Sequence, residues 1–268
     1  MRRLLLTLVV SAGALVDASV SARVTSQPHY GEISPKPLRG GGGQAPPSLR
    51  ADAFAVARNA TWAVAMLRMA PKGQIDQAAF VGTGFFASRT HFVTASHVIN
   101  AKLLGRPRHA GDRIRVFKDE LMGDGFNEMK VIFDDADLDV AILQSAITTK
   151  AWFTVSVEPP REGDEVGLYG YPLVEFATLS NATAFALGRV GMVAGFGRRA
   201  GARRMIATFN VSEGNSGGPV FLTSTGHVVA VQTSQATNAA GKDLDGYSIS
   251  TPLSAIQSEL QKLGILSR

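Results

Sequence analysis

The chain has 268 residues, of which 45% are hydrophobic and 18% are charged, a balance typical of a globular protein with one large core or two smaller ones. Lysine and arginine number 27 against 22 aspartates and glutamates, so the small positive net charge gives no reason to expect a nucleic acid partner. Cysteine is absent, which excludes disulfide bonds, thiolate metal ligands and a cysteine nucleophile.

The first 22 residues have the layout of a secretory signal peptide. Two arginines precede an apolar run from Leu4 to Val16, and small residues then lead to Ala22. The run is short for a membrane span, and the alternative is an N-terminal anchor that is not cleaved. We expect cleavage after residues 1–22, export to a bacterial periplasm or exterior, and no stable membrane span in the remaining chain.

Residues 23–50 are dominated by proline, glycine and serine and lack any apolar periodicity. This composition is typical of a flexible linker or a short pro-segment. The folded domain is therefore expected over residues 51–268.

Beyond residue 51, short segments with strand character alternate with turns rich in glycine, proline and aspartate. The segments of a first set are ATWAVAML, FVGTGFFAS, HFVTASHVI, RIRVFK, KVIFD, DVAILQ and FTVSV, and those of a second set are DEVGLYGYP, FALGRVGMVAG, RRMIATFN, GPVFLTS, HVVAVQTSQ and GYSIST. Paired prolines in EPPREG, residues 158–163, separate the two sets because they do not fit a central strand. The pattern predicts an all-β protein with two barrels or sandwiches of about six strands, over about 51–157 and 158–251.

The end of the chain has helical periodicity. Apolar residues recur at Leu253, Ile256, Leu260 and Leu263, shortly after a proline. We predict a helix over about 252–266 that packs against the second set of strands.

Ser216 lies among small residues in VSEGNSGGPV, where glycines allow unusual torsions or a close approach to backbone amides. A serine hydroxyl becomes a strong nucleophile when an imidazole takes its proton and a carboxylate orients the imidazole. Of the five histidines, only His97 follows an apolar strand and small residues that would present its ring beyond the strand end. Solvated positions in the linker, in a loop or at the start of a strand are expected for the remainder, which are His29, His91, His109 and His227.

Three segments around these residues resemble chymotrypsin-like serine peptidases. GTGFFAS with FVTASHV is similar to the glycine-rich hairpin and histidine segment of that family, DLDVAIL to its acid segment and GNSGGPV to its nucleophile segment. The order His97, Asp139, Ser216 is also the order of this clan. GDEVGLYGYP further resembles the start of the second barrel in the cysteine-free Deg-type branch. The resemblance covers the chain from about residue 60 and implies two six-stranded antiparallel β-barrels with a site in the cleft between them.

The resemblance also implies a role for each of these residues. Ser216 would attack the substrate carbonyl, His97 would act as general base and then general acid, and Asp139 would orient the imidazole. Asp137 is the next alternative, but in this family the acid stands directly before the apolar strand. The backbone amides of Gly214 and Ser216 would form the oxyanion hole.

Substrate binding is assigned by the same resemblance. Asn210, six residues before the nucleophile, would floor the primary pocket, and Thr233, Ser234 and Gln235 would pair with the substrate backbone as an added strand. Since Asn210 is neutral, no strong preference for Arg or Lys is expected. Asn215 is also neutral, so we expect local hydrogen bonds of its amide, not an inserted N-terminal ammonium, to hold the oxyanion hole.

These observations predict an exported serine endopeptidase that acts on proteins or peptides and needs no metal or cofactor. The alternatives are an esterase with the same acyl chemistry and a non-catalytic peptide-binding protein. The chain ends at its predicted helix, so the PDZ domain of many Deg-type relatives is not expected. Arginines in GRRAGARR, residues 197–204, are expected in a solvated loop between strands.

Overall fold

The computed structural model describes residues 47–70, 75–101, 111–118, 127–172, 186–199, 201–238 and 240–266. The predicted signal peptide over 1–22 and most of the predicted linker over 23–50 lie outside these residues, as do His29 and His109. Within the described ranges, no helix combines the length and the apolar character that crossing a membrane requires.

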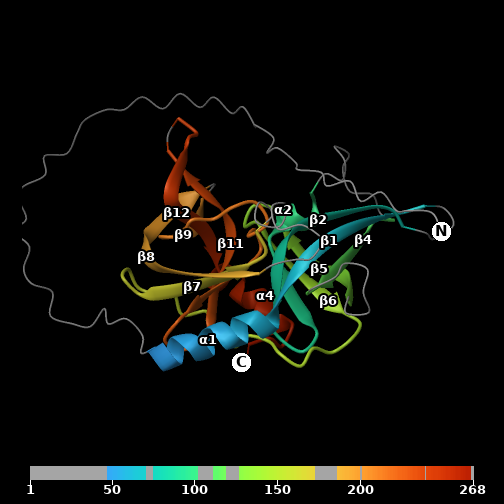
Figure 1. Ribbon diagram of the computed structural model, residues 1–268, viewed down its shortest axis with the longest axis horizontal. Helices are drawn as coiled ribbons and strands as arrows, with labels where there is room; N and C mark the ends of the chain where they lie inside the picture. The colour runs from blue at the N-terminus through green and yellow to red at the C-terminus, as the bar shows by residue number, and fades with distance from the viewer. Residues whose placement is uncertain are drawn as a thin grey trace, which may run out of the picture.

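Two closed six-stranded barrels make up the described fold, and every strand pair is antiparallel (Figure 1), which confirms the predicted fold class. Barrel one, in strand order β1-β2-β3-β6-β5-β4, consists of β1 (Thr61–Met69), β2 (Ile75–Phe86), β3 (His91–Thr94), β4 (Arg113–Phe117), β5 (Asn127–Asp135) and β6 (Val140–Ser145). Barrel two, in strand order β10-β11-β12-β9-β8-β7, consists of β7 (Glu165–Gly170), β8 (Leu187–Arg199), β9 (Ala202–Ala207), β10 (Pro219–Leu222), β11 (Val228–Thr237) and β12 (Asp243–Pro252).

Each barrel has its own apolar core, and a third cluster joins the barrels. Phe86 and Phe92 are buried in barrel one, and Leu168 and Phe209 are buried in barrel two. The third cluster combines aromatic and aliphatic side chains of both barrels with both terminal helices and includes Ala53, Ala57, Phe85, Phe153, Phe221, Val228, Leu253, Ile256 and Leu260. Burial of this much apolar surface fixes how the barrels sit against each other.

Helix α1 (Pro47–Ala60) precedes the first strand and was not predicted from the sequence. It runs along the underside of the molecule in Figure 1, where its buried residues are Ala53, Ala57 and Ala60 and Phe54 is partly buried against the same cluster. Arg50 pairs with Glu165 of β7 through two hydrogen bonds of 3.0 and 2.6 Å. A face made of alanines gives a weak apolar periodicity, which is why the pattern did not indicate a helix.

Segment FTVSV, residues 153–157, is not the strand that its composition predicted. It connects the barrels, and only Val155 forms an isolated parallel bridge, to Val228 of β11. The Phe153 amide donates to the Phe86 carbonyl at 2.9 Å and the Val228 amide to the Thr154 carbonyl at 3.0 Å. Since six other strands already close barrel one, this segment bonds to both barrels instead of extending a sheet.

Two predicted elements are shorter than expected. Strand β3 ends at Thr94, and the following residues form the one-turn helix α2 (Ser96–Ile99). The predicted C-terminal helix consists of a 3₁₀ turn, η1 (Leu253–Ile256), followed by α4 (Gln257–Lys262). Gly264, at φ 69°, lies just past its end, in the left-handed conformation that commonly terminates a helix.

Candidate active site

His97 lies on α2, the one-turn helix that follows β3 of barrel one. Val98 and Ile99 are buried in the barrel-one core, whereas the side chain of His97 remains 49% exposed. Burial of two consecutive residues in this single turn sets its orientation, so the imidazole points outward. The sequence placed His97 just beyond an apolar strand, and the structure places it in the one-turn helix that follows that strand.

Asp139 ends the turn between β5 and β6 and holds the imidazole. Its carboxylate lies 2.8 and 3.0 Å from His97 Nδ1, and it also accepts the His97 backbone amide at 2.9 Å. Among the described residues other than glycine, Asp139 alone has a positive φ, at 56°. Aspartate tolerates this left-handed conformation better than most residues. An Nδ1–H bonded to a carboxylate leaves the Nε2 lone pair free to accept a proton.

The pKa of Asp139 lies below its ordinary value. Burial raises the pKa of this carboxyl, but the hydrogen bonds and charge of His97, together with the charge of Arg204, lower it by more in total. Asp139 therefore stays ionised at neutral pH and is able to stabilise an imidazolium. Asp137 is exposed, and within the described residues no hydrogen bond joins its carboxylate to His97.

Ser216 lies in the loop between β9 and β10, beside β11. Its Oγ donates to the Thr233 carbonyl at 3.3 Å, and in the described part of the chain no hydrogen bond connects it to His97. Gly217 has φ 86° and packs so tightly against Thr83 and Thr94 that a Cβ there would overlap both residues. Only glycine fits this position, which explains the residue that follows the serine.

The loop leaves two amides unbonded. The amides of Asn215, Gly217 and Gly218 donate to backbone carbonyls, with N···O distances of 3.1, 2.7 and 3.0 Å. No hydrogen bond between described residues uses the amides of Gly214 and Ser216. Gly214 has φ 93°, a conformation that a side chain would disfavour. Two free donors one residue apart are able to bind an oxyanion.

Thr83 of β2 fastens this loop to barrel one and was missed by the sequence reasoning. Its Oγ1 donates to the Gly214 carbonyl at 2.6 Å and accepts the Tyr171 amide at 2.9 Å. The Thr83 amide also donates to the Ser216 carbonyl at 2.9 Å, and the side chain is fully buried. The available signal was a threonine between two glycines in GTGFF, which indicates a close approach but not the partner.

Asn215 is buried at 2% exposure and makes the expected local hydrogen bonds. Its backbone amide donates to the Ser212 carbonyl at 3.1 Å, and its side-chain Nδ2 donates to Ser212 Oγ at 3.3 Å. In the described part of the chain, this side chain therefore bonds to a neutral local partner and to no charged one.

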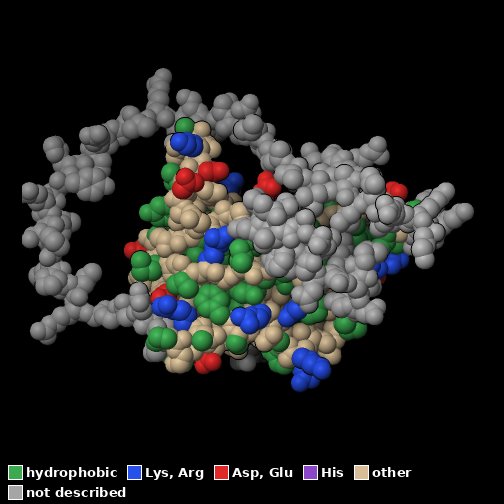
Figure 2. Space-filling view, in the orientation of Figure 1, with side chains coloured by type: hydrophobic (Ala, Val, Ile, Leu, Met, Phe, Trp, Pro, Cys, Tyr) green, Lys and Arg blue, Asp and Glu red, His purple; other side chains and the backbone are tan. Residues whose placement is uncertain are grey.

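The predicted substrate-binding residues lie on two elements of barrel two. Asn210 is exposed, with its Oδ1 near Gly246 of β12. Thr233, Ser234 and Gln235 follow one another on β11, and the β11–β12 register shifts between Gln232 and Ser234, next to the Ser216 contact. The β11–β12 hairpin projects at the top of Figure 1, and Figure 2 shows acidic and basic side chains side by side at its tip.

A cavity of about 590 Å³ opens beside His97 and Asp139. Its lining also includes Asn100, Asp137, Arg199, Arg204 and Thr233. The prediction of a loop for residues 197–204 is wrong, because Arg198 and Arg199 lie on β8 and Arg203 and Arg204 on β9. The first three are exposed as expected, whereas Arg204 is only 6% exposed. Arg204 faces inward because strand alternation in the β8–β9 hairpin turns it away from Arg203.

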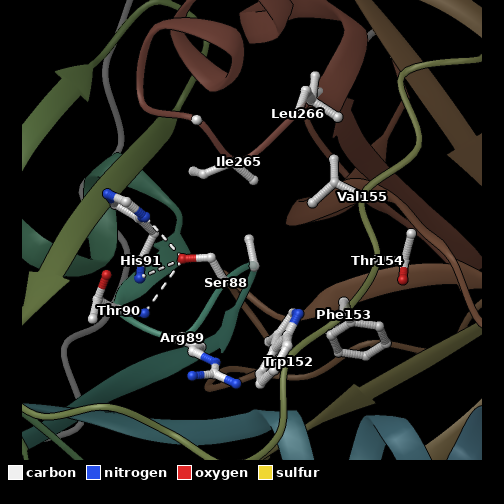
Figure 3. A pocket seen from close by; sticks show the side chains of 12 residues that line it. Ser88, Arg89, Thr90, His91, Trp152, Phe153, Thr154, Val155, Ile265 and Leu266 are labelled. Atoms are coloured by element: carbon white, nitrogen blue, oxygen red, sulfur yellow. Dashed lines mark hydrogen bonds between the residues drawn. The ribbon is translucent and has the colours of Figure 1, made fainter. Parts of the chain in front are cut away.

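A second cavity, of about 520 Å³, contains another serine and histidine pair (Figure 3). Ser88 Oγ lies 2.8 Å from His91 Nδ1 and also accepts the backbone amides of Thr90 and His91. Because Ser88 Oγ already accepts hydrogen bonds from two amides, its own hydroxyl hydrogen is directed to His91 Nδ1. These three hydrogen bonds close a tight turn. Burial lowers the pKa of His91, and among the described residues no carboxylate is hydrogen-bonded to it. This pair therefore stabilises the β2–β3 connection.

Comparisons with known proteins agree with this fold. A family model described as a trypsin-like peptidase domain matches residues 82–231. The HtrA-type protease AlgW with a tripeptide is similar at 18% identity and a TM-score of 0.58, over 81% of this chain and 63% of AlgW. The Rv3671c protease of M. tuberculosis in its active form is similar at 20% identity and a TM-score of 0.57, over 88% and 96% of the two chains.

The serine endoprotease from Yersinia pestis is a further similar structure, at 21% identity and a TM-score of 0.55, over 83% of this chain and 68% of that one. This chain spans 63% of the AlgW chain that was solved with a tripeptide, which is less than two thirds of its length. A search of curated proteins finds no match. At these identities the solved structures support the fold, and the family match supports the class of protein.

Proposed function

Because the chain belongs to the family of trypsin-like peptidases, we propose that it is a serine endopeptidase that cleaves proteins or peptides through an acyl-enzyme on Ser216. The observation that carries the proposal is the His97 imidazole, held at Nδ1 by the Asp139 carboxylate at 2.8 Å. This arrangement leaves Nε2 available as a general base.

In the first half of the reaction, the Ser216 hydroxyl turns from the Thr233 carbonyl towards His97 Nε2. Its oxygen attacks the substrate carbonyl carbon while its proton passes to Nε2, and the amides of Gly214 and Ser216 bind the resulting oxyanion. The amine then leaves with the proton from His97. In the second half, water replaces the amine, His97 takes its proton, and hydrolysis of the ester releases the acid and restores Ser216.

Two further parts of the proposal rest on the sequence. The signal-like residues 1–22 support export to the periplasm or exterior. The neutral Asn210 supports a primary pocket for apolar or small polar side chains, and Thr233, Ser234 and Gln235 offer the β11 backbone for pairing with the substrate. AlgW was solved with a tripeptide and with a decapeptide, which supports a peptide as the ligand class.

Labelling with a fluorophosphonate probe, followed by mass spectrometry of the adduct, tests the proposal. We expect the adduct on Ser216, and we expect Ser216→Ala and His97→Ala to lose both labelling and casein cleavage. Ser88→Ala is the matched control because it removes a hydroxyl from the other serine and histidine pair. Cleavage of casein by Ser216→Ala at the wild-type rate would overturn the proposal.

A further inference from the structure

Arg204 is a buried cation of barrel two that reaches into the acid turn of barrel one. Its Nη1 donates to the Leu138 carbonyl at 2.6 Å and its Nη2 to the Asp137 carbonyl at 2.7 Å. Nη1 also donates to Thr251 Oγ1, and that hydroxyl donates to the same Leu138 carbonyl at 2.7 Å. Three hydrogen bonds from β9 and β12 thus hold the two peptide carbonyls directly before Asp139.

Stability alone is a weak reason for this arrangement. Removing a guanidinium from water is costly, and replacing a buried charge network with apolar residues is often neutral or stabilising. Arg204 Nε is also buried with no hydrogen-bond partner in the described part of the chain, so the cation is not fully satisfied. The carboxylates that act on the guanidinium are those of Asp139 and Asp135, and Arg199 opposes them.

The position of these contacts relative to the site points to a function. Asp139 has the left-handed φ of 56°, and a residue in that conformation persists only where its surroundings fix it. On the barrel-one side, the turn is fixed by the Leu138 amide, which donates to Asp135 Oδ1 at 2.8 Å. On the barrel-two side, the contacts are those of Arg204 and Thr251.

We propose that Arg204 is a positioning residue: by holding the carbonyls of Asp137 and Leu138 from barrel two, it fixes the Asp139 backbone so that the carboxylate meets His97. The inference rests on the proposed function for its catalytic consequence. A shift of the carboxylate by about 1 Å is enough to lower turnover by about 100-fold. The acid is therefore correctly placed only when the two barrels are docked.

Arg204→Met tests this role because it keeps the length of the side chain but removes its donors. We expect kcat to fall about 10- to 100-fold, while KM stays within about threefold because β11 and Asn210 are untouched. Arg204→Lys keeps the charge but cannot bond both carbonyls at once, so it should restore only part of the loss. Arg203→Met is the matched control. Arg203 lies on β9 beside Arg204, but its side chain is exposed and stacks on Phe196 of β8.

Proton NMR adds a readout that needs no turnover. A hydrogen bond from His97 Nδ1 to a carboxylate moves the signal of that proton far downfield, and we expect Arg204→Met to shift or broaden the signal while Arg203→Met preserves it. Thr251→Val removes one bond to the Leu138 carbonyl and should have a smaller effect in the same direction. It replaces Arg204→Met as the test variant if Arg204→Met does not fold.

The inference is overturned if a folded Arg204→Met, or Thr251→Val in its place, keeps both the NMR signal and wild-type kcat. Failure of the proposed function is distinguishable, because wild-type protein would then lack probe labelling while the NMR comparison still reports on Arg204.

Discussion

Thr83→Val is the substitution that most directly tests how the oxyanion loop is held. Valine has nearly the same shape as threonine but lacks the hydroxyl that bonds the Gly214 carbonyl and the Tyr171 amide, at 2.6 and 2.9 Å. Both backbone groups belong to buried residues, so neither gains water as a replacement partner. The change therefore leaves one acceptor and one donor unsatisfied without creating a cavity.

The expected cost follows from these two groups. Each buried polar group left without a partner costs about 1–3 kcal/mol, so the free energy of unfolding should fall by about 2–6 kcal/mol. For a domain of this size, that loss corresponds to a decrease in Tm of roughly 4–24 °C. A misplaced Gly214 amide removes part of the about 3–4 kcal/mol that one oxyanion donor supplies, so kcat should fall by about 10- to 100-fold.

The assay compares Tm, urea denaturation and kcat per site titrated with the fluorophosphonate probe. Thr94→Val is the control, since its Oγ1 donates to the Thr83 carbonyl at 2.6 Å and does not touch Gly214. It should lose stability but keep kcat within about threefold. Thr83→Ser should keep both bonds and kcat, and lose only the stability that its buried methyl group contributes. A Thr83→Val enzyme with reduced Tm and unchanged kcat per site would refute the link between this bond and the oxyanion amide.

Three further predictions concern charge and specificity. First, kcat/KM should rise with pH because a histidine that acts as general base works only in its unprotonated form, and a flat profile from about pH 4 to 8 would contradict a histidine base. Second, the lowered pKa of folded Asp139 stabilises the protein above the unfolded value of about 3.9, and this contribution is lost as the pH falls through the folded pKa. The unfolding free energy of Asp139→Asn, measured in urea, should therefore approach that of wild type at acid pH, and a gap that widens there would contradict this sign. Third, a peptide library should show no preference of about 100-fold for Arg or Lys before the cleaved bond, and such a preference would mean that Asn210 does not floor the pocket.

The fold could be predicted from the sequence because strands and turns are local patterns. Alternating apolar segments and paired prolines located most of the strands and the boundary between the barrels. Helix α1 and the connector FTVSV could not be placed, since their structure depends on surfaces of both barrels. Alanines at 53 and 57 become an apolar face only against the interface cluster, and the β-propensity of residues 153–157 is overridden because barrel one is already closed.

The candidate site likewise contains residues that the sequence could indicate and residues that it could not. His97, Asp139 and Ser216 each lie in a short motif whose residues are adjacent in the chain, so resemblance indicated all three. Thr83 and Arg204 act on carbonyls that are 131 and 66 residues away along the chain. No local pattern reports such a contact, and a buried arginine beside three others looks like part of a solvated loop.

Thr83 and Arg204, which the sequence did not indicate, each bond to a segment of the other barrel. Thr83 of barrel one holds the loop of Ser216, which belongs to barrel two, whereas Arg204 of barrel two holds the turn of Asp139, which belongs to barrel one. Under the proposed mechanism, each barrel thus supports a reactive segment of the other. The apolar cluster between the barrels then has two effects, because the burial that docks them also brings both supporting side chains to their partners.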